Sequence, residues 1–326
     1  MLKFKIHQNL NRTLKIFSAA VILFSSFAAS GAPDMSIPLK TFYFGRYSIS
    51  APTDGSGLWT SYKIIQKDLQ LISKNGKRDI NIKVNESIAE INTLHKSGYK
   101  GFDQKIPLDG GGVIVVSKST SYDFDIYYLT SSNTLYRQTV ESIAINSFDK
   151  AVELAKDLNS LIHYRHPASN PPDGSFAVDA GYLTLPHDKY PEQVSIGLPI
   201  STVPGIHVIF DTQVIRKPEP GLIERYEQRT AGIVTPMLQK ILTSSTLLRK
   251  TKRTVAGLNF DELLLKTRAN DRNFYSFRLE YPGTPKSSMK PYTVIEMSTL
   301  DEGETFNNDE DAIKFWDTLV NSIKRI

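Results

Sequence analysis

The sequence predicts an α+β protein built from two domains, each with a mainly antiparallel sheet and packed helices. Three features support this fold class. Runs of strand-like segments end in an amphipathic helix, and this order occurs twice along the chain. A segment with three prolines, Pro167–Gly174, separates the two series. The 326 residues are enough for two ordinary domains that each bury a core.

The first 32 residues have the order of a secretory signal peptide. Basic residues come first, an apolar run follows at 16–29, and small residues end at Ala32. This run is shorter than the about 20 residues that span a membrane. We therefore expect cleavage after Ser30, Gly31 or Ala32 and a mature chain that is not inserted in a membrane; an uncleaved anchor is the alternative. The expected division is a signal peptide at 1–32, an N-terminal domain at 33–166, a Pro-rich linker at 167–174 and a C-terminal domain at 175–326.

The net charge of the chain falls when the predicted signal peptide is set aside. The full sequence carries +5, which alone suggests nucleic acid or an anionic surface as partner. Residues 1–32 hold four of the 39 Lys and Arg residues and none of the 34 acids, so the remainder carries +1. We therefore expect no nucleic-acid partner. The sequence has no cysteine, which excludes disulfides, thiol nucleophiles and zinc-cysteine sites.

In the first half, aromatic and β-branched residues predict strands, and helical spacing predicts two helices. One helix begins after the cap Asn85 and ends before Gly98, and the other follows the cap Ser147. Residues 61–72 fit either a strand or a helix. The inner face of the first helix is expected to hold Ile88, Ile91 and Leu94. The expected strands are Thr41–Ser50, Val113–Val116, Tyr122–Leu129 and Thr134–Val140.

The second half repeats this pattern. Short helices are expected at Pro220–Gln228 and Met237–Leu242. A last helix follows the cap Asn308, with acids in its first turn and Lys324 and Arg325 near its end, as the helix dipole favours. The expected strands are Phe176–Leu185, Gln193–Leu198, Ile206–Ile215, Thr254–Leu258, Glu262–Thr267, Phe274–Tyr281 and Tyr292–Ser298.

No recognised catalytic or metal-binding pattern occurs in the sequence. His163 and His166 are three residues apart and lack the glutamate of a helical zinc motif. There is no G-x-S-x-G nucleophile elbow, although a Ser-His-Asp triad can be dispersed along a chain. Gly110–Gly112 lacks the Lys-Ser/Thr that completes a phosphate-binding loop. We therefore expect no catalytic residue, no cofactor and no metal, and binding in place of catalysis.

Two charged segments are candidate partner-binding surfaces. One is an acidic loop that lacks the regular ligand spacing of a calcium loop. The other is a basic cluster directly before an apolar strand. Both also fit an ordinary solvated surface. The candidate residues are Asp301, Glu302 and Glu304 in the acidic loop, and Arg249, Lys250, Lys252 and Arg253 in the basic cluster.

Three spaced segments resemble one protein family. Phe44–Pro52, which reads FGRYSISAP, resembles the opening strand of the periplasmic immunity proteins that accompany type VI secretion lipase effectors, the Tle-cognate immunity proteins of group four. Gly174–Tyr182 is similar to the strand that starts their C-terminal domain. Phe260 and Leu279 depart from the family pattern, which has glycine and tryptophan there. The remaining resemblance lies in Arg253–Gly257, Asp261, Glu262, Arg268, Tyr275, Phe277, Glu280, Gly283, Pro291 and Ile295–Met297.

The resemblance implies an inhibitor that acts by binding a protein. Members of the family bind an incoming lipase in the periplasm, and their two α+β domains are arranged as a claw around the region that covers its active site. The resemblance thus implies a one-to-one complex with a cognate lipase effector that keeps lipid substrate out. Arg253, Gly257, Glu262 and Glu296 also fit a structural role, as a turn glycine and charges paired across strands.

The residues leave two other functions open. One is a periplasmic hydrolase whose dispersed triad includes His207 or His163. The other is a module that binds lipid or glycan of the cell envelope. A structure that places a nucleophile beside one of these histidines would favour the hydrolase. Binding to membranes or sacculi without a protein partner would favour the module.

Overall fold

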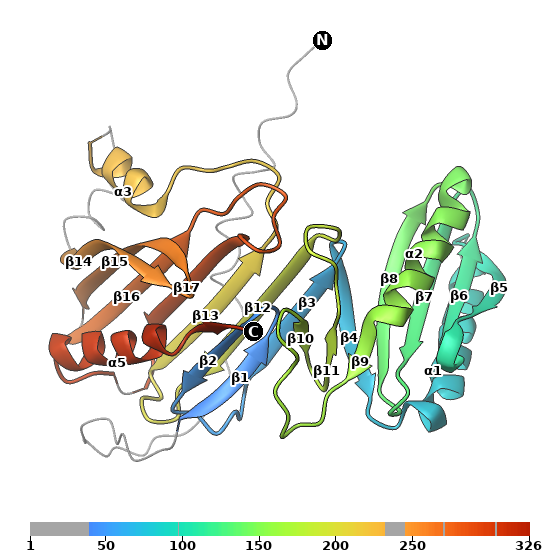
Figure 1. Cartoon of the computed structure of the whole chain (residues 1–326), viewed down its shortest axis with the longest axis horizontal. Coiled ribbons are helices and arrows are strands. Elements are labelled where there is room, and N and C mark those ends of the chain that lie inside the picture. The colour runs from blue at the N-terminus through green and yellow to red at the C-terminus, as the bar shows by residue number, and fades with distance from the viewer. Residues whose placement is uncertain (1–38, 97, 232–244, 270, 304) are drawn as a thin grey trace, which may run out of the picture. The chain divides into compact units, whose positions relative to one another are not determined.

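The computed structural model describes residues 39–96, 98–231, 245–269, 271–303 and 305–326. The predicted signal peptide at 1–32, the predicted helix Met237–Leu242 and Glu304 lie outside the described residues. The described residues contain a sheet of twelve strands with antiparallel pairing (Figure 1). Its strand order is β14 (Ser245–Val255), β15 (Leu258–Ala269), β16 (Arg272–Tyr281), β17 (Tyr292–Thr299), β13 (Ile206–Gln213), β12 (Glu192–Pro199), β3 (Trp59–Ile64), β4 (Lys67–Ser73), β8 (Leu135–Ile143), β7 (Tyr122–Leu129), β6 (Val113–Lys118) and β5 (Gly101–Pro107).

This sheet has two halves that meet only at the β3–β4 hairpin. β3 pairs with β12 over its whole length, whereas it pairs with β4 only through Lys63–Asp68 and Ile64–Lys67. β4 then turns away and pairs with β8. The two residues of the turn, Ile65 and Gln66, have φ angles of 56° and 63°, which belong to a tight hairpin turn. β3 and β4 therefore diverge from a shared turn.

Two three-stranded sheets pack beside the main sheet. β1 (Lys40–Phe44) and β2 (Tyr47–Ala51) form a hairpin, and the C-terminal β18 (Lys324–Arg325) pairs with β2. The second small sheet has the order β10 (Phe176–Val178), β11 (Gly181–Leu183), β9 (Ile162–Tyr164). Strands from the start of the chain thus pair with strands from its second half. Residues 33–326 form one compact unit by their contacts, and the division at 167–174 stays a prediction.

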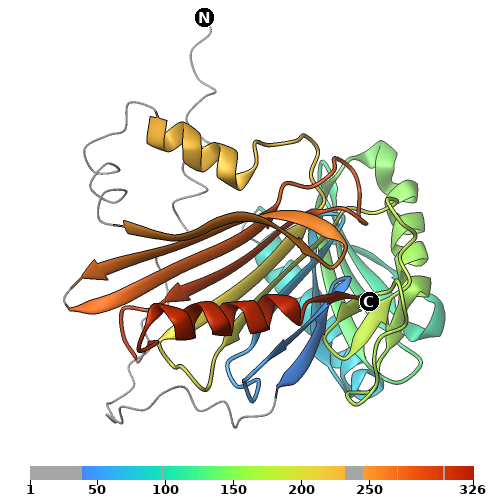
Figure 2. The ribbon, with the colours of Figure 1, turned by 60° about the vertical axis from the view of Figure 1, so that its left-hand side comes forward.

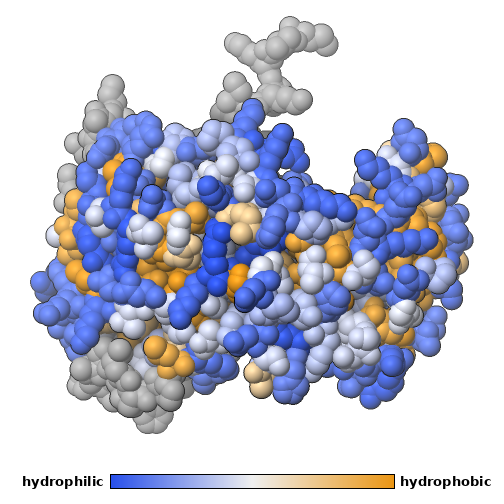
Figure 3. Space-filling view, viewed as in Figure 1, coloured by the Kyte–Doolittle hydropathy of each residue, from blue (hydrophilic) through white to orange (hydrophobic). Residues whose placement is uncertain are grey.

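Four helices cover the faces of the main sheet in the described residues. In the half formed by β4–β8, α1 (Gly76–His95) lies on one face and α2 (Phe148–Leu161) on the other. Figure 2 shows α3 (Leu222–Ala231) and α5 (Asp309–Asn321) on opposite sides of β14–β17. Figure 3 shows the face with α5 and α2, where apolar patches lie among larger polar areas. An antiparallel sheet with packed helices confirms the predicted α+β class.

Three expected strands contain turns. Thr41–Ser50 is divided at Gly45 into β1 and β2, and Phe176–Leu185 is divided into β10 and β11. The expected strand Thr254–Leu258 is also wrong, because Ala256 and Gly257 form the turn between β14 and β15 with φ angles of 49° and 77°. Gly257 was thus correctly predicted as a turn glycine. The ambiguous segment 61–72 is most of the β3–β4 hairpin.

The helix predictions also differ in their limits. α1 begins nine residues before the expected cap Asn85, because Ile80 and Val84 already pack against the sheet. Leu94, expected on the inner face, is 45% exposed. Ser147 makes no side-chain cap to α2, whereas Asn308 caps α5 by accepting a hydrogen bond from the Asp311 amide at 2.9 Å. The expected helix Pro220–Gln228 corresponds to α3.

The motif FGRYSISAP places a buried arginine at the β1–β2 turn. Arg46 donates two hydrogen bonds to the Glu192 carboxylate, at 2.8 and 2.6 Å, and others to the carbonyls of Gly174 and Leu185. The backbone carbonyl of Arg46 also accepts a hydrogen bond from the amide of Ile326. Arg46 therefore joins β12 and the end of the Pro-rich segment through its side chain, and the chain terminus through its backbone.

Candidate functional site

The divergence of β3 and β4 opens a groove between the two halves of the main sheet. Beyond the hairpin, residues 59–62 of β3 and 69–73 of β4 each lack a strand partner on the side that faces the groove. Unpaired strand edges are sites where another chain can add backbone hydrogen bonds. The β3–β4 groove has a volume of about 410 Å³ and is lined by Thr60, Ser61, Tyr62, Asp68, Leu69, Gln70, Leu71, Ile72 and Asp179.

Asp179 fixes the floor of the β3–β4 groove. It lies in the turn between β10 and β11, and its carboxylate accepts hydrogen bonds from Thr60 Oγ1 at 2.8 Å and from the Tyr62 hydroxyl at 3.0 Å. Its carbonyl accepts from the Tyr136 hydroxyl of β8 at 2.7 Å. Burial, with the nearby Asp179 charge, raises the pKa of Tyr62, which stays a hydrogen-bond donor. These bonds hold both walls of the groove in place.

A glycine makes this arrangement possible. A Cβ atom on Gly181 would lie 2.3 Å from the Tyr136 hydroxyl and 2.6 Å from the His163 carbonyl oxygen. Such distances are too short for any larger residue unless the backbone moves. The sequence GSFAVDAGY therefore brings Asp179 and Tyr136 together by keeping position 181 free of a side chain.

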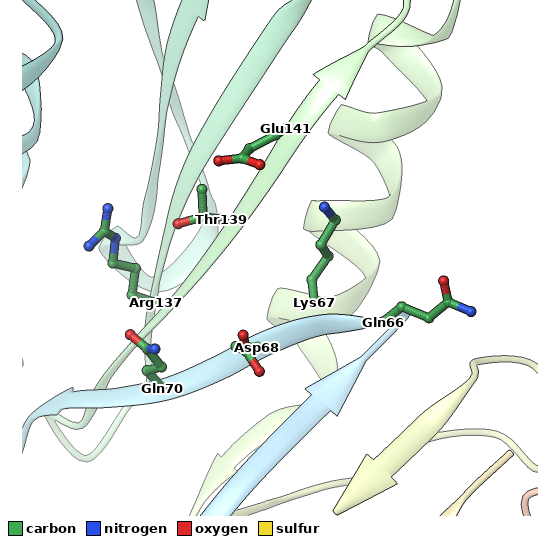
Figure 4. A pocket seen from close by; sticks show the side chains of 7 residues that line it. All are labelled: Gln66, Lys67, Asp68, Gln70, Arg137, Thr139 and Glu141. Carbon is green, nitrogen blue, oxygen red and sulfur yellow. The ribbon is translucent and has the colours of Figure 1, made fainter. Parts of the chain in front are cut away.

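A second cavity, the Arg137 pocket, adjoins the groove (Figure 4). Its volume is about 280 Å³, and it shares Asp68 and Gln70 with the groove. Figure 4 shows Arg137 and Thr139 along β8, opposite side chains of β4. Because residues two apart on a strand share a face, these side chains form one polar surface. The pocket is lined by Gln66, Lys67, Asp68, Gln70, Arg137, Thr139 and Glu141.

Asp125 on β7 organises the Arg137 pocket. It accepts two hydrogen bonds from Arg137, at 2.9 and 2.7 Å, and one each from Ser87 and Thr139, at 2.7 and 2.8 Å. This paired guanidinium and carboxylate are fully engaged, and the Asp125 hydrogen bond raises the pKa of Arg137 further. The arrangement orders the surface of the pocket.

His163 and His207 are the histidines that a dispersed catalytic triad could include. The His163 ring contacts the Thr184 hydroxyl at 3.2 Å, and burial lowers the pKa of His207. Neither histidine makes an ion pair or hydrogen bond with a carboxylate in the described part of the chain. Among the same residues, no group of three or more His, Asp or Glu is placed to hold a metal ion. The described helices include none that is long and apolar enough to cross a membrane.

Two residues of the predicted basic cluster are internal cross-links. Arg249 and Arg253 of β14 both reach Glu262 of β15 and Asp317 of α5, at 2.6 to 3.0 Å. Trp316 of α5 also donates to Glu262, at 2.9 Å. Arg253 on β14 and the buried Glu262 on β15 are thus charges paired across neighbouring strands, as predicted.

The other predicted partner-binding residues lie on the surface. Lys250 pairs with Glu227 of α3 at 2.8 Å, and Lys252 is exposed. Asp301 and Glu302 are exposed in the loop after β17, and the Asp301 carbonyl accepts from Arg272. The basic cluster and the acidic loop are on different elements, and partner binding by either stays a prediction.

Sequence reasoning did not find the β3–β4 groove. Its residues come from three segments that are up to 119 positions apart, as in the Thr60–Asp179 hydrogen bond. The one local signal was the ambiguity of 61–72, which arose because a hairpin turn interrupts the alternation of two strands.

The sequence of this chain matches one known protein family. Residues 171–325 match the family model of the Tle cognate immunity protein 4 C-terminal domain. The match includes all of the second and third resembling segments. Its range contains β10 to β18 and the residues of the Arg253–Glu262 network. No curated protein gives a significant match to the chain.

Solved structures share the fold over most of the chain. One is described as the apo structure of immunity protein TplEi of T6SS from Pseudomonas aeruginosa, with TM-score 0.76, 22% identity, and coverage of 88% of this chain and 97% of that chain. Another is TplEi complexed with "L" peptide, with TM-score 0.74, 22% identity, and coverage of 90% and 99%. A third is described as the Tle4-Tli4 complex, with TM-score 0.76, 23% identity, and coverage of 88% and 97%. These similarities establish the fold.

Proposed function

We propose that this chain is an immunity protein that binds and neutralises a phospholipase or lipase effector of a type VI secretion system. The observation that carries the proposal is the family match of residues 171–325. It is supported by a fold that aligns over 88% of the chain with a chain of the Tle4-Tli4 complex. An immunity protein bound to a peptide shares this fold as well.

The proposed mechanism is occlusion by a one-to-one complex. The β3–β4 groove offers two unpaired strand edges and a floor that is already fixed by hydrogen bonds to Asp179. A preformed site loses little conformational entropy when a partner segment enters it. A groove of about 410 Å³ suits a few side chains, and the surrounding surface would supply the rest of an ordinary interface. The effector region that covers its active site is the part held.

The cellular setting follows from the same proposal. Residues 1–32 would export the chain to the periplasm and be removed, which leaves a near-neutral binding protein with two α+β domains arranged as a claw. The chain itself would not be an enzyme. Support for this comes from the site, where Arg137 and Asp125 satisfy each other and the histidines lack carboxylate partners in the described residues.

Co-purification with the lipase that is encoded beside this chain tests the proposal. The mature chain should form a one-to-one complex with it and abolish its hydrolysis of phospholipid. Ser61→Arg and Gln70→Arg place a long cation at the rim of the groove and should weaken the complex. Glu153→Arg on α2 is the matched control, because Glu153 is exposed and lines neither the groove nor the Arg137 pocket. An active lipase in the presence of excess wild-type chain would refute the proposed function.

A further inference from the structure

A third cavity lies under the second half of α1. The buried residues of this helix end at Ser87, whereas Ile91 is half-buried and Leu94 is 45% exposed. The helix therefore covers the sheet fully only along its first half. The space left between its second half and β6–β8 has a volume of about 310 Å³, and we name it the α1 cleft. It shares Arg137, Thr139 and Glu141 with the Arg137 pocket and thus continues the surface of the candidate site.

Part of the lining of the α1 cleft is apolar and exposed. Leu94 and Tyr99 line it, and Tyr99 is 65% exposed. Phe102 of β5, which is 37% exposed, pairs with the lining residue Ser117 and therefore shares its face of the sheet. These are three of the nine large apolar side chains that the described chain exposes. Clustered exposed apolar side chains mark interaction surfaces in soluble proteins.

The α1 cleft also carries an excess of negative charge. Asp125 is neutralised by Arg137, and Asp123 by Lys100. Glu90 and Glu141 also line the cleft, and neither makes an ion pair or a hydrogen bond within the described part of the chain. Four acids and two cations thus line the cleft. A cation that another molecule provides would satisfy the two carboxylates that have no ion pair.

We propose that the α1 cleft binds a segment of the effector in which an apolar side chain lies next to Lys or Arg. The apolar side chain would pack on Leu94, Tyr99 and Phe102, and the cation would lie between Glu90 and Glu141. Lys and Arg suit this position because their stems lie along apolar surface while their charged ends reach carboxylates. This inference rests on the proposed function and identifies a second contact, which would distinguish the cognate effector from others.

The test measures affinity for the same lipase at low and at high ionic strength. The double variant Glu90→Gln, Glu141→Gln should raise Kd about tenfold at low ionic strength, and salt should reduce this difference because it screens exposed charges. Tyr99→Ala should raise Kd about tenfold at both ionic strengths, because its contact is apolar. All these side chains are exposed, so thermal unfolding should match wild type.

Two control variants change the same residue types elsewhere. Glu153→Gln removes an exposed acid on α2, and Ile145→Ala shortens an apolar side chain that is 60% exposed; both should bind the lipase as wild type does. If wild type binds and inhibits while the cleft variants keep its affinity, the assignment of the α1 cleft is wrong and the proposed function stands. If wild type does not bind, both fail. A dimer of this chain that Tyr99→Ala abolishes would show that a second copy occupies the cleft, which also overturns the assignment.

Discussion

Replacement of Arg46 by methionine tests how the FGRY motif stabilises the fold. The side chains of Arg46 and Glu192 are 7% and 5% exposed, and two hydrogen bonds of 2.6 and 2.8 Å join them. Removal of one partner leaves a buried charge without compensation, which costs about 3–5 kcal/mol. A protein of ordinary stability has about 5–15 kcal/mol in total. Arg46→Met should therefore lower the free energy of unfolding by about 4 kcal/mol, measured by urea denaturation at neutral pH.

The pH dependence gives this prediction a second readout. Burial raises the pKa of Glu192 even beside Arg46, and loss of the guanidinium raises that pKa further. A carboxyl group with a higher pKa in the folded state binds more protons there than in the unfolded state. Lower pH therefore favours the folded variant, because Glu192 becomes neutral. The stability gap between wild type and Arg46→Met should shrink from neutral pH to about pH 5.

Two further variants complete the test. The double variant Arg46→Met, Glu192→Leu removes both charges and should recover much of the lost stability. Lys83→Met breaks an exposed ion pair, Lys83–Glu86, and should cost less than about 0.5 kcal/mol. The reasoning fails if Arg46→Met unfolds as wild type does, or if the double variant is as unstable as the single one.

Three other variants probe the network, the sheet and the groove. Glu262→Leu removes the carboxylate that pairs with Arg249 and Arg253, and should lower the free energy of unfolding by about 3 kcal/mol. Denaturation followed by Trp316 fluorescence measures this loss, and wild-type stability would contradict a stabilising role for the network. Burial raises the pKa of Asp211 to about 6, so its contribution to stability should fall as the pH rises from about 4 to 6. Asp211→Asn should reduce this slope in thermal melts, whereas an unchanged slope would exclude Asp211 as a source of it. Gly181→Ala places Cβ 2.3 Å from the Tyr136 hydroxyl and should lower the free energy of unfolding by about 2 kcal/mol in urea denaturation. No loss of stability would mean that the residues at the groove floor can move to make room for the methyl group.

The sequence predicted elements wherever a local signal was strong. The strands β7 and β8 were anticipated because aromatic and β-branched residues are dense in both, and Asn308 was recognised as a cap. The β3–β4 hairpin was missed because its turn is Ile65–Gln66, and isoleucine rarely adopts a positive φ. The turn at Gly45 was missed because a single glycine inside aromatic residues reads as part of one strand.

The site was less accessible to sequence reasoning than the fold. The groove needs Thr60, Asp179 and Tyr136, which the strand order of the sheet brings together and which no spacing along the chain reveals. Arg249 and Arg253 were candidates for partner binding as a basic run, yet their place on β14 directs them to Glu262 and Asp317. A charge pattern in a sequence does not show which charged side chains form ion pairs with residues on neighbouring strands.

Titration of the lipase with the mature chain tests the central claim most directly. Phospholipid hydrolysis by a fixed amount of the proposed cognate lipase effector would be measured against increasing amounts of residues 33–326. We predict a linear loss of activity that ends when the two proteins are equal in amount, because a tight one-to-one complex removes one lipase for each chain added. Full lipase activity at a large excess of the chain would contradict the account.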